Sequence, residues 1–260
     1  MDDLDQSRKQ KNEMVILSVI FGAFFCICIL LLGAVLLLYT RNFNEFSTDP
    51  IFFIPATPTP ASCPKVPTGW TLEVNETFDN NKKGWPLGLE YDDYGKTRSE
   101  IIDGKYRIQA TVNRDVNYYY FPLMDFGTSD FFLRADVHQV EGPPDSLYGI
   151  IFRLNYDGDR YFFGIRDSQR FILDQRFRDE WVKLIPITYS PSIRSGETNQ
   201  LTVLAQGSRF SLCANRLLVA EFENEDIAFG IAGFSYTLFN EGDEAEFEFD
   251  NFRLYVPPSE

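Results

Sequence analysis

Acidic residues recur at every second position near the C-terminus of the chain: Glu244, Glu246, Glu248 and Asp250. On a β-strand this spacing places all four carboxylates on one face, about 7 Å apart pairwise. Retaining glycosidases use two carboxyl groups about 5–5.5 Å apart, so Glu246 and Glu248 are the candidate catalytic pair. Alternating acids also form the ordinary solvated face of an antiparallel strand, and the sequence favours this second interpretation.

Six aromatic residues are candidates for a sugar-binding platform, because sugar rings stack on aromatic faces and exposed aromatics suggest binding. They are Trp85, Tyr91, Tyr94, Tyr118, Tyr120 and Trp181. Residues 117–121 have the sequence NYYYF. On a strand this places Tyr118 and Tyr120 on one face and Tyr119 and Phe121 on the other. One of these pairs belongs to the core. For each of the six residues, a role in core packing is the alternative.

Two aspartates lie near the start and the end of the predicted folded region, in the motifs FDNN at 78–81 and FDNF at 249–252. If the first and last strands lie side by side, Asp79 and Asp250 come together, and their carboxylate oxygens suit Ca²⁺. Aspartate turns that hydrogen-bond their own backbone are the alternative. Asp157 and Asp159 also resemble part of a calcium loop, but the other ligands are missing and a hairpin turn explains them.

Cys63 and Cys213 are the only cysteines outside the apolar segment at the N-terminus. A disulfide between them is chemically allowed if the folded region is exported, and the sequence leaves this pairing open. The single histidine excludes metal sites that need two imidazoles. This residue, His138, points outward on its predicted strand, and we expect a surface role rather than a catalytic one.

The elements that must position these residues are β-strands. In residues 132–138 apolar and polar side chains alternate, whereas residues 147–154 are apolar almost throughout, as in a strand covered on both faces. The Asp-Gly pair at 157–158 predicts a hairpin that joins this strand to residues 161–165. The other predicted strands are 71–78, 105–112, 117–121, 170–174, 181–185, 200–205, 209–214, 217–222, 229–234 and 245–252. About a dozen short strands without a helical stripe predict an all-β, antiparallel two-sheet jelly-roll sandwich.

Short motifs follow one another in order along this region: FDN at 78–80 with GW at 84–85, DGKY at 103–106, YGIIFR at 148–153, YFF at 161–163, NQLTV at 199–203, GIAGF at 230–234 and FDNF at 249–252. The set resembles the concanavalin A-like lectin/glucanase superfamily, and within it the laminin-G-like and 3-keto-disaccharide-hydrolase-like domains of bacterial surface proteins. The resemblance covers about residues 70–257. It implies extracellular recognition, often of carbohydrate, and some members are glycoside hydrolases, so the sites must be argued separately.

The chain departs from this family at two places. In the glucanases the catalytic strand lies mid-chain on the concave sheet, whereas the acidic strand here is nearly C-terminal. At Asn215-Arg216 the family usually has Asn-Gly. Arginine at a positive-φ turn position costs about 1 kcal/mol, so we expect this hairpin to use another turn type.

Residues 14–39 carry no charge and are long enough to cross a bilayer as a helix, but too long for a cleaved signal peptide. Arg8, Lys9 and Lys11 precede this segment and Arg41 alone follows it, which predicts a short cytoplasmic tail at 1–13. Residues 40–69 are rich in proline and threonine and predict an extended extracytoplasmic linker. The sandwich domain then spans 70–257.

The chain has 38 acidic and 24 basic residues, a balance that argues against a nucleic-acid partner. The sequence therefore predicts a single-pass cell-membrane protein whose extracellular domain binds a glycan or a protein ligand without catalysis. Two alternatives stay open. One is a membrane-tethered glycoside hydrolase that uses Glu246 and Glu248, and the other is a structural or sensory ectodomain that binds a neighbouring membrane protein. Ca²⁺ is the one cofactor considered.

Overall fold

The computed structural model describes residues 61–124 and 126–258. The predicted cytoplasmic tail, the predicted transmembrane helix at 14–39 and residues 40–60 of the predicted linker lie outside the described residues. Within the described ranges, no helix is long and apolar enough to cross a membrane. The regular elements found there are fifteen β-strands.

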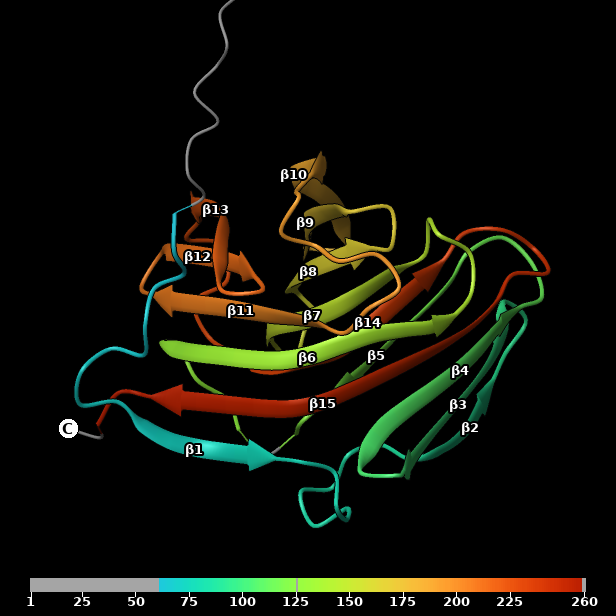
Figure 1. Ribbon diagram of the computed structural model, residues 1–260, viewed down its shortest axis with the longest axis horizontal. Helices are drawn as coiled ribbons and strands as arrows, with labels where there is room; N and C mark the ends of the chain where they lie inside the picture. The colour runs from blue at the N-terminus through green and yellow to red at the C-terminus, as the bar shows by residue number, and fades with distance from the viewer. Residues whose placement is uncertain (1–60, 125, 259–260) are drawn as a thin grey trace, which may run out of the picture. The chain divides into compact units, whose positions relative to one another are not determined.

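Nine of these strands form one antiparallel sheet. Its order is β13(Leu217–Glu223), β12(Arg209–Ala214), β11(Asn199–Gln206), β6(Phe131–Glu141), β15(Glu244–Val256), β4(Lys105–Val112), β3(Gly95–Ile102) and β2(Gly88–Tyr91), and β1(Thr71–Glu76) also pairs with β15. Figure 1 shows β11, β6, β15 and β1 side by side on the face nearer the viewer. The pairing of β1 with β15 brings the first and last described strands together, which is the condition on which the predicted approach of Asp79 and Asp250 depends.

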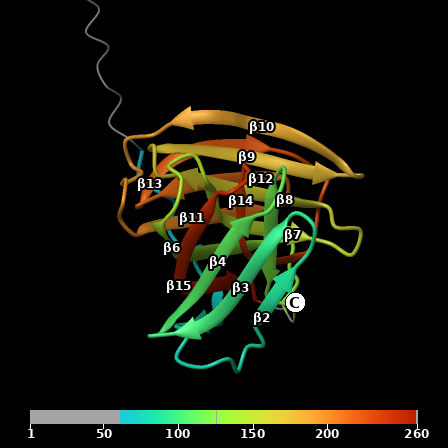
Figure 2. The same ribbon diagram turned by 90° about the vertical axis from the view of Figure 1, so that its right-hand side faces the viewer.

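The other six strands form a second antiparallel sheet. Its order is β10(Glu180–Tyr189), β9(Arg170–Phe177), β8(Arg160–Arg166), β7(Leu147–Leu154), β14(Ile231–Leu238) and β5(Asn117–Pro122). In Figure 2 β10 and β9 cross the top of the molecule, and β4, β3 and β2 lie in front. The predicted all-β, two-sheet sandwich is confirmed.

The core lies between the two sheets and follows from strand alternation. Tyr148, Ile150 and Phe152 of β7 are fully buried in the main core cluster. The alternate positions of the same strand, Leu147 and Ile151, belong to a second apolar cluster with residues of β8 and β9. This second cluster lies on the outer face of the six-stranded sheet, where the side chains bury one another. The apolar run at 147–154 is therefore covered on both faces, as its composition indicated.

Trp85 is part of the main core rather than of a binding platform. Its side chain is only 1% exposed and stacks on Phe234 with ring centroids 5.1 Å apart. The indole Nε1–H donates to the Glu76 carboxylate at 3.3 Å, which satisfies the polar end of the buried ring. The prediction that Trp85 contacts a ligand is therefore wrong, because this large aromatic fills the space between the sheets.

The β12–β13 turn corrects a second prediction. Asn215 and Arg216 both have positive φ, at 51° and 68°, so the hairpin uses the turn that the sequence argued against. Several contacts offset the cost of this conformation. The Asn215 Oδ1 accepts from the Gln200 backbone N–H at 3.0 Å, and the Arg216 carbonyl accepts from the Cys63 N–H at 2.9 Å. Beside the turn, Cys63 and Cys213 form a disulfide with Cα atoms 5.8 Å apart.

Candidate functional site

A pocket of about 370 Å³ lies on the outer face of the six-stranded sheet. Each strand of the sheet contributes a side chain to its lining: Tyr118 from β5, Ser235 from β14, Leu147 from β7, Phe162 from β8, Asp174 from β9 and Trp181 from β10. These residues alternate with core residues along their strands, which explains why they face outward. We call this the main pocket.

The sheet is strongly curved around the main pocket. Tyr118 and Trp181 lie on its two edge strands, β5 and β10, yet their ring centroids are only 6.0 Å apart, edge to face. In a flat sheet these strands would be separated by five strand spacings, roughly 24 Å, which two side chains cannot bridge. Small residues run across the middle of the sheet, where Ser235 pairs with Gly149 and Gly149 with Gly164. The outer face is therefore hollow.

Arg160 lies deep in this hollow and is 3% exposed. Its guanidinium carbon is 4.5 Å from the Tyr120 ring centroid, 5.0 Å from that of Trp181 and 5.9 Å from that of Tyr118. Burial lowers the pKa of Arg160, although a guanidinium stays charged in a protein. The three rings hold the cation by cation–π attraction, and the cation in turn fixes their positions.

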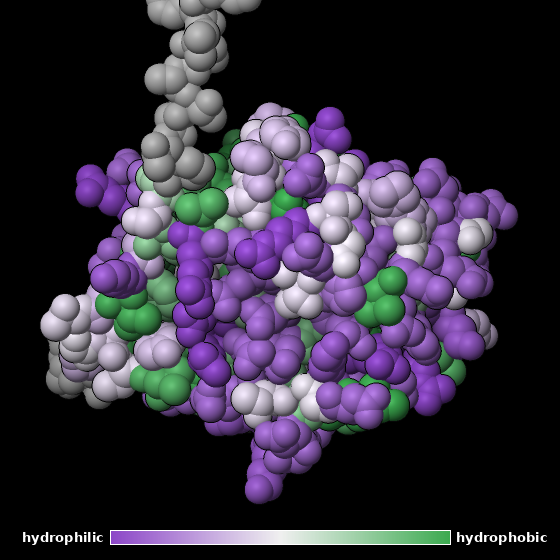
Figure 3. All heavy atoms as spheres, in the orientation of Figure 1, coloured by the Kyte–Doolittle hydropathy of each residue, from purple (hydrophilic) through white to green (hydrophobic). Residues whose placement is uncertain are grey.

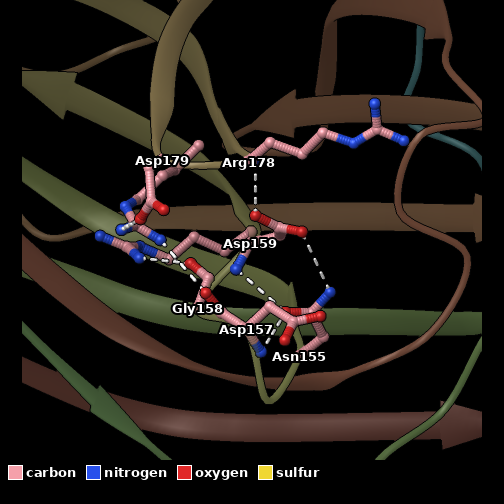
Figure 4. A network of polar contacts seen from close by, with 8 residues as sticks. Asn155, Asp157, Gly158, Asp159, Arg178 and Asp179 are labelled. Atoms are coloured by element: carbon pink, nitrogen blue, oxygen red, sulfur yellow. Dashed lines mark hydrogen bonds and ion pairs between the residues drawn. The ribbon is translucent and has the colours of Figure 1, made fainter.

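The β7–β8 turn positions Arg160 at the start of its strand. Figure 4 shows the turn, in which the Asn155 Oδ1 accepts from the backbone N–H groups of Asp157 and Asp159, both at 3.0 Å. The Asp159 carboxylate accepts from the Arg178 N–H at 2.8 Å, which ties this turn to the next one. These two aspartates therefore serve the hairpin, as the Asp-Gly pair indicated.

Asp174 is the one carboxylate among the described residues that line the main pocket. Burial raises its pKa to about 6, and the positive charges of Lys183 and Arg166 oppose this shift only in part. Within the described ranges, the buried Asp174 Oδ1 and Arg166 Nε have no hydrogen-bond partner. Buried polar atoms without partners carry a free-energy cost that a ligand can relieve.

Two further pockets adjoin the main pocket along β5. The first, of about 450 Å³, shares Tyr118 with the main pocket and adds Tyr94. The second, of about 150 Å³, shares Tyr119 with the first one and not with the main pocket, and adds Tyr91. We call the three together the aromatic groove. Tyr91 is 81% exposed, Trp181 50% and Tyr118 44%. The structure thus brings five of the six predicted aromatic residues, all except Trp85, to one surface.

The acidic strand β15 lies in the other sheet and faces away from the groove. Arg107 lies 2.9 Å from a Glu248 oxygen and 3.3 Å from a Glu246 oxygen, and Lys105 also pairs with Glu248. Although burial raises the pKa of Glu248, hydrogen bonds from Lys105 and Arg107 outweigh it and lower this pKa. A general acid needs a pKa near the working pH, so Glu248 is suited to an ion pair rather than to proton donation.

The aspartates of the predicted calcium site lie near the β1–β15 pairing. Burial raises the pKa of Asp250, and the charges of Asp136 and Asp79 act in the same direction. The Asp79 Oδ2 accepts from the Thr77 hydroxyl at 2.8 Å, and the Asp250 Oδ1 accepts from the Asn251 N–H at 2.6 Å. In the described part of the chain, no group of three or more His, Cys, Asp or Glu side chains is arranged to hold a metal ion. Calcium binding by this pair stays a prediction.

Three charged residues of the main pocket were not predicted from the sequence: Arg160, Asp174 and Lys183. Asp174 and Lys183 lie at outward positions of predicted strands, so alternation alone could have placed them on this face. Arg160 was expected in the turn before the strand at 161–165, whereas β8 begins at Arg160. What alternation does not show is that the face curves inward and brings them together.

No family model matches the chain, and no curated protein matches it in sequence. Solved structures match it in fold. A GlcNAcα1-4Gal-releasing endo-β-galactosidase from Clostridium perfringens matches with a TM-score of 0.54 and 10% identity, over 75% of this chain and 65% of that one. The kappa-carrageenase of Pseudoalteromonas carrageenovora matches with 0.52 and 8%, over 74% and 98%. A laminarinase from Flavobacterium sp. UMI-01 matches with 0.52 and 11%, over 72% and 100%. The described domain therefore shares the two-sheet jelly-roll fold of these structures.

Proposed function

We propose that this domain is a glycan-binding module without catalytic activity, and that the glycan lies in the aromatic groove. One observation carries the proposal: two half-exposed aromatic rings, Tyr118 and Trp181, meet across the hollow outer face of the six-stranded sheet. Exposed aromatic rings on a concave surface offer faces for the C–H surfaces of sugar rings. Tyr94 and Tyr91 extend this surface past the edge strand β5.

The groove also carries polar groups that fix the orientation of a sugar. Ser235, Thr237 and Asp174 line the main pocket beside the aromatic rings. A few convergent polar groups on a mostly apolar wall are typical of small-molecule sites. The adjoining pockets make the groove longer than a single sugar ring requires, so it suits a chain of sugars.

The distribution of carboxylates supports binding rather than hydrolysis. Glycosidases of the common type need two carboxyl groups that flank the scissile bond. Asp174 is the one carboxylate among the described lining residues of the main pocket, and Glu246 and Glu248 lie on the other sheet in ion pairs. Glu90 and Asp92 line the adjoining pockets and not the main one, so they do not form a pair with Asp174 across it. The similarity to glycan-active enzymes therefore extends the case for a glycan site but not for their chemistry.

The location of the module is part of the proposal. The uncharged segment at 14–39 is expected to anchor the chain in a membrane, with the sandwich domain on the extracellular side. A module held at the surface in this way would capture polysaccharides from the medium or from a neighbouring cell envelope.

The test is a binding screen of the purified full-length chain against a broad panel of polysaccharides, with the Trp181→Ala variant beside the wild type. We expect saturable binding of at least one polysaccharide and an affinity loss of about thirtyfold in Trp181→Ala, as for a buried aromatic anchor. Tyr156→Ala is the matched control, because Tyr156 is fully exposed and lies outside the three pockets.

Two results would contradict the proposal. A folded wild-type chain that binds no polysaccharide would point to a protein partner and leave the sandwich as a scaffold. Binding that Trp181→Ala and Tyr156→Ala leave equally unchanged would move the glycan site away from the aromatic groove.

A further inference from the structure

The main pocket gathers positive charge in an acidic domain. Residues 71–260 contain 32 acidic and 19 basic side chains. Arg160 and Lys183 nevertheless line the main pocket, and the Arg166 guanidinium lies 5.2 Å from the ring centroid of Phe239, another lining residue. The carboxylate of Asp174 faces these cations and that of Asp145 lies near Arg166, so the cations outnumber the carboxylates by one. The local charge is therefore opposite in sign to that of the domain.

These cations also lack ion-pair partners. In the part of the chain that the structure describes, no carboxylate oxygen lies within 4.0 Å of the charged nitrogens of Arg160, Arg166 or Lys183. Arg160 donates to the Gly158 carbonyl at 2.7 Å, and the buried Arg166 Nε has no partner at all within those residues. Outside the pocket, by contrast, Arg107 and Lys105 share the carboxylate of Glu248. Lys183 lies opposite Asp174 in the β9–β10 register, but the two charged groups are not within ion-pair distance. The positive charge at the pocket is therefore not neutralised by a direct ion pair.

We propose that the main pocket gives the aromatic groove a preference for an acidic glycan, one whose sugars carry carboxylate or sulfate groups. Glu90 and Asp92 line the adjoining pockets, so the acidic group of the glycan binds in the main pocket. This inference rests on the proposed function and names the ligand class of the same site. The aromatic rings would stack on sugar rings of either kind, whereas the cations discriminate between charged and neutral chains.

The position of each cation in the structure indicates how it would contribute to binding an anion. Lys183 lies at an exposed position of the edge strand β10, where its flexible ammonium reaches a bound anion as a point charge. Arg166 presents a planar fork that matches carboxylate or sulfate oxygens in pairs. Arg160 is held by three rings, is itself buried, and contributes a fixed positive field at the pocket.

The experiment compares charged polysaccharides with neutral counterparts of the same backbone. Polygalacturonate is paired with its fully methyl-esterified form, and a sulfated galactan with the desulfated galactan. The full-length wild type is tested beside Lys183→Gln and the matched control Lys96→Gln, which removes an exposed cation from the outer face of the other sheet.

We expect the charged member of at least one pair to bind about tenfold more tightly than its neutral counterpart, as for a charge-assisted hydrogen bond. Lys183→Gln is expected to remove most of this preference, Lys96→Gln to leave it intact, and added salt to weaken it. A preference within the uronate pair assigns the anion as a carboxylate, and one within the galactan pair assigns it as a sulfate.

Two outcomes overturn the inference and are distinguishable. Neutral members that bind as tightly as charged ones, with Lys183→Gln equal to wild type, would disprove acidic selectivity while glycan binding stands. A folded chain that binds no polysaccharide of either kind would disprove both proposals. A charge preference that Lys183→Gln and Lys96→Gln reduce equally would show general attraction to the surface and would also count against the groove.

Discussion

The outer faces of the two sheets differ in how their charged side chains are paired. On the nine-stranded sheet, β4 and β15 place Lys105 and Arg107 beside Glu246 and Glu248, so that cations and carboxylates neutralise one another across the strands. The face turned toward the viewer in Figure 3, which includes this sheet, is largely hydrophilic. On the six-stranded sheet, Arg160 and Lys183 line the main pocket without an ion pair among the described residues. Lys183 lies opposite Asp174 in the β9–β10 register, yet in the described residues Asp174 keeps a buried oxygen without a hydrogen-bond partner.

This difference suggests that the two outer faces have different roles, one in the stability of the fold and the other in ligand binding. Opposite charges that face each other on neighbouring strands contribute to the stability of a sheet and leave little to offer a ligand. Unpaired polar atoms and half-exposed aromatics cost stability in the free protein, and a ligand that pairs with them recovers that free energy. We therefore expect changes on the nine-stranded sheet to affect folding, and changes on the six-stranded sheet to affect glycan binding.

The largest expected effect on stability is removal of the disulfide on the nine-stranded side. Cys63 and Cys213 are separated by 150 residues in the sequence, and a crosslink that closes so long a loop stabilises a fold by about 2–5 kcal/mol. The double variant Cys63→Ser/Cys213→Ala should unfold at lower denaturant concentration by that amount. Glycan affinity, measured where the variant is still folded, should not change. Loss of glycan affinity in the folded variant would contradict the expectation that the two faces have separate roles.

A smaller effect is expected at the ion pairs of β15. The Glu248 side chain is 10% exposed and pairs with two cations, so Glu248→Gln should lower the free energy of unfolding by about 1–2 kcal/mol. Glu223→Gln is the control, because its pair with Arg209 is mostly exposed and should contribute little. Both variants should bind glycan as the wild type does. A glycan-hydrolysing activity that Glu248→Gln abolishes would instead establish the hydrolase alternative.

The smallest effect is expected at Asp174 and depends on pH. Its pKa of about 6 lies above the ordinary 3.8, so the folded state binds this proton more tightly than the unfolded state does. The stability that Asp174 provides is therefore greatest at acidic pH and is lost as the pH rises through 6. Asp174→Asn should be more stable than the wild type by about 1 kcal/mol at pH 7.5, after allowance for partial solvent exposure, and nearly equal to it at pH 4.

Denaturant unfolding of both proteins at the two pH values measures this difference. The charged groups that face Asp174 are Lys183 on β10 and Arg166 on β8, and the variant keeps both. The change of the stability difference with pH therefore reports on the Asp174 carboxyl. A constant difference between variant and wild type across the two pH values would show that Asp174 is solvated like an ordinary surface aspartate.

Most of the fold could be predicted from the sequence, because strand alternation is a local property. The runs at 105–112, 147–154 and 209–214 coincide with β4, β7 and β12. The strands β2 and β3 were missed. The inward positions of β3 include Thr97 and Ser99, so this strand does not show the alternation of apolar and polar residues on which the prediction depended.

The candidate site could be predicted only in part. Tyr118 and Trp181 are distinctive as residue types, but their meeting depends on the curvature of a sheet whose edge strands are far apart in the sequence. Trp85 shows the limit of residue type, since a tryptophan in a loop motif lies in the core. The role of Arg160 follows from three rings on two other strands, and no local pattern contains that information.

The most direct test of the central claim is hydrogen–deuterium exchange of the full-length chain, with and without the polysaccharide that it binds most tightly. The account predicts slower exchange in peptides that cover Asn117–Pro122 and Glu180–Tyr189, the edge strands that carry Tyr118 and Trp181. Exchange in Glu244–Val256 should stay unchanged. Protection confined to Glu244–Val256 and Lys105–Val112, with none at β5 or β10, would place the ligand on the opposite face and contradict the account.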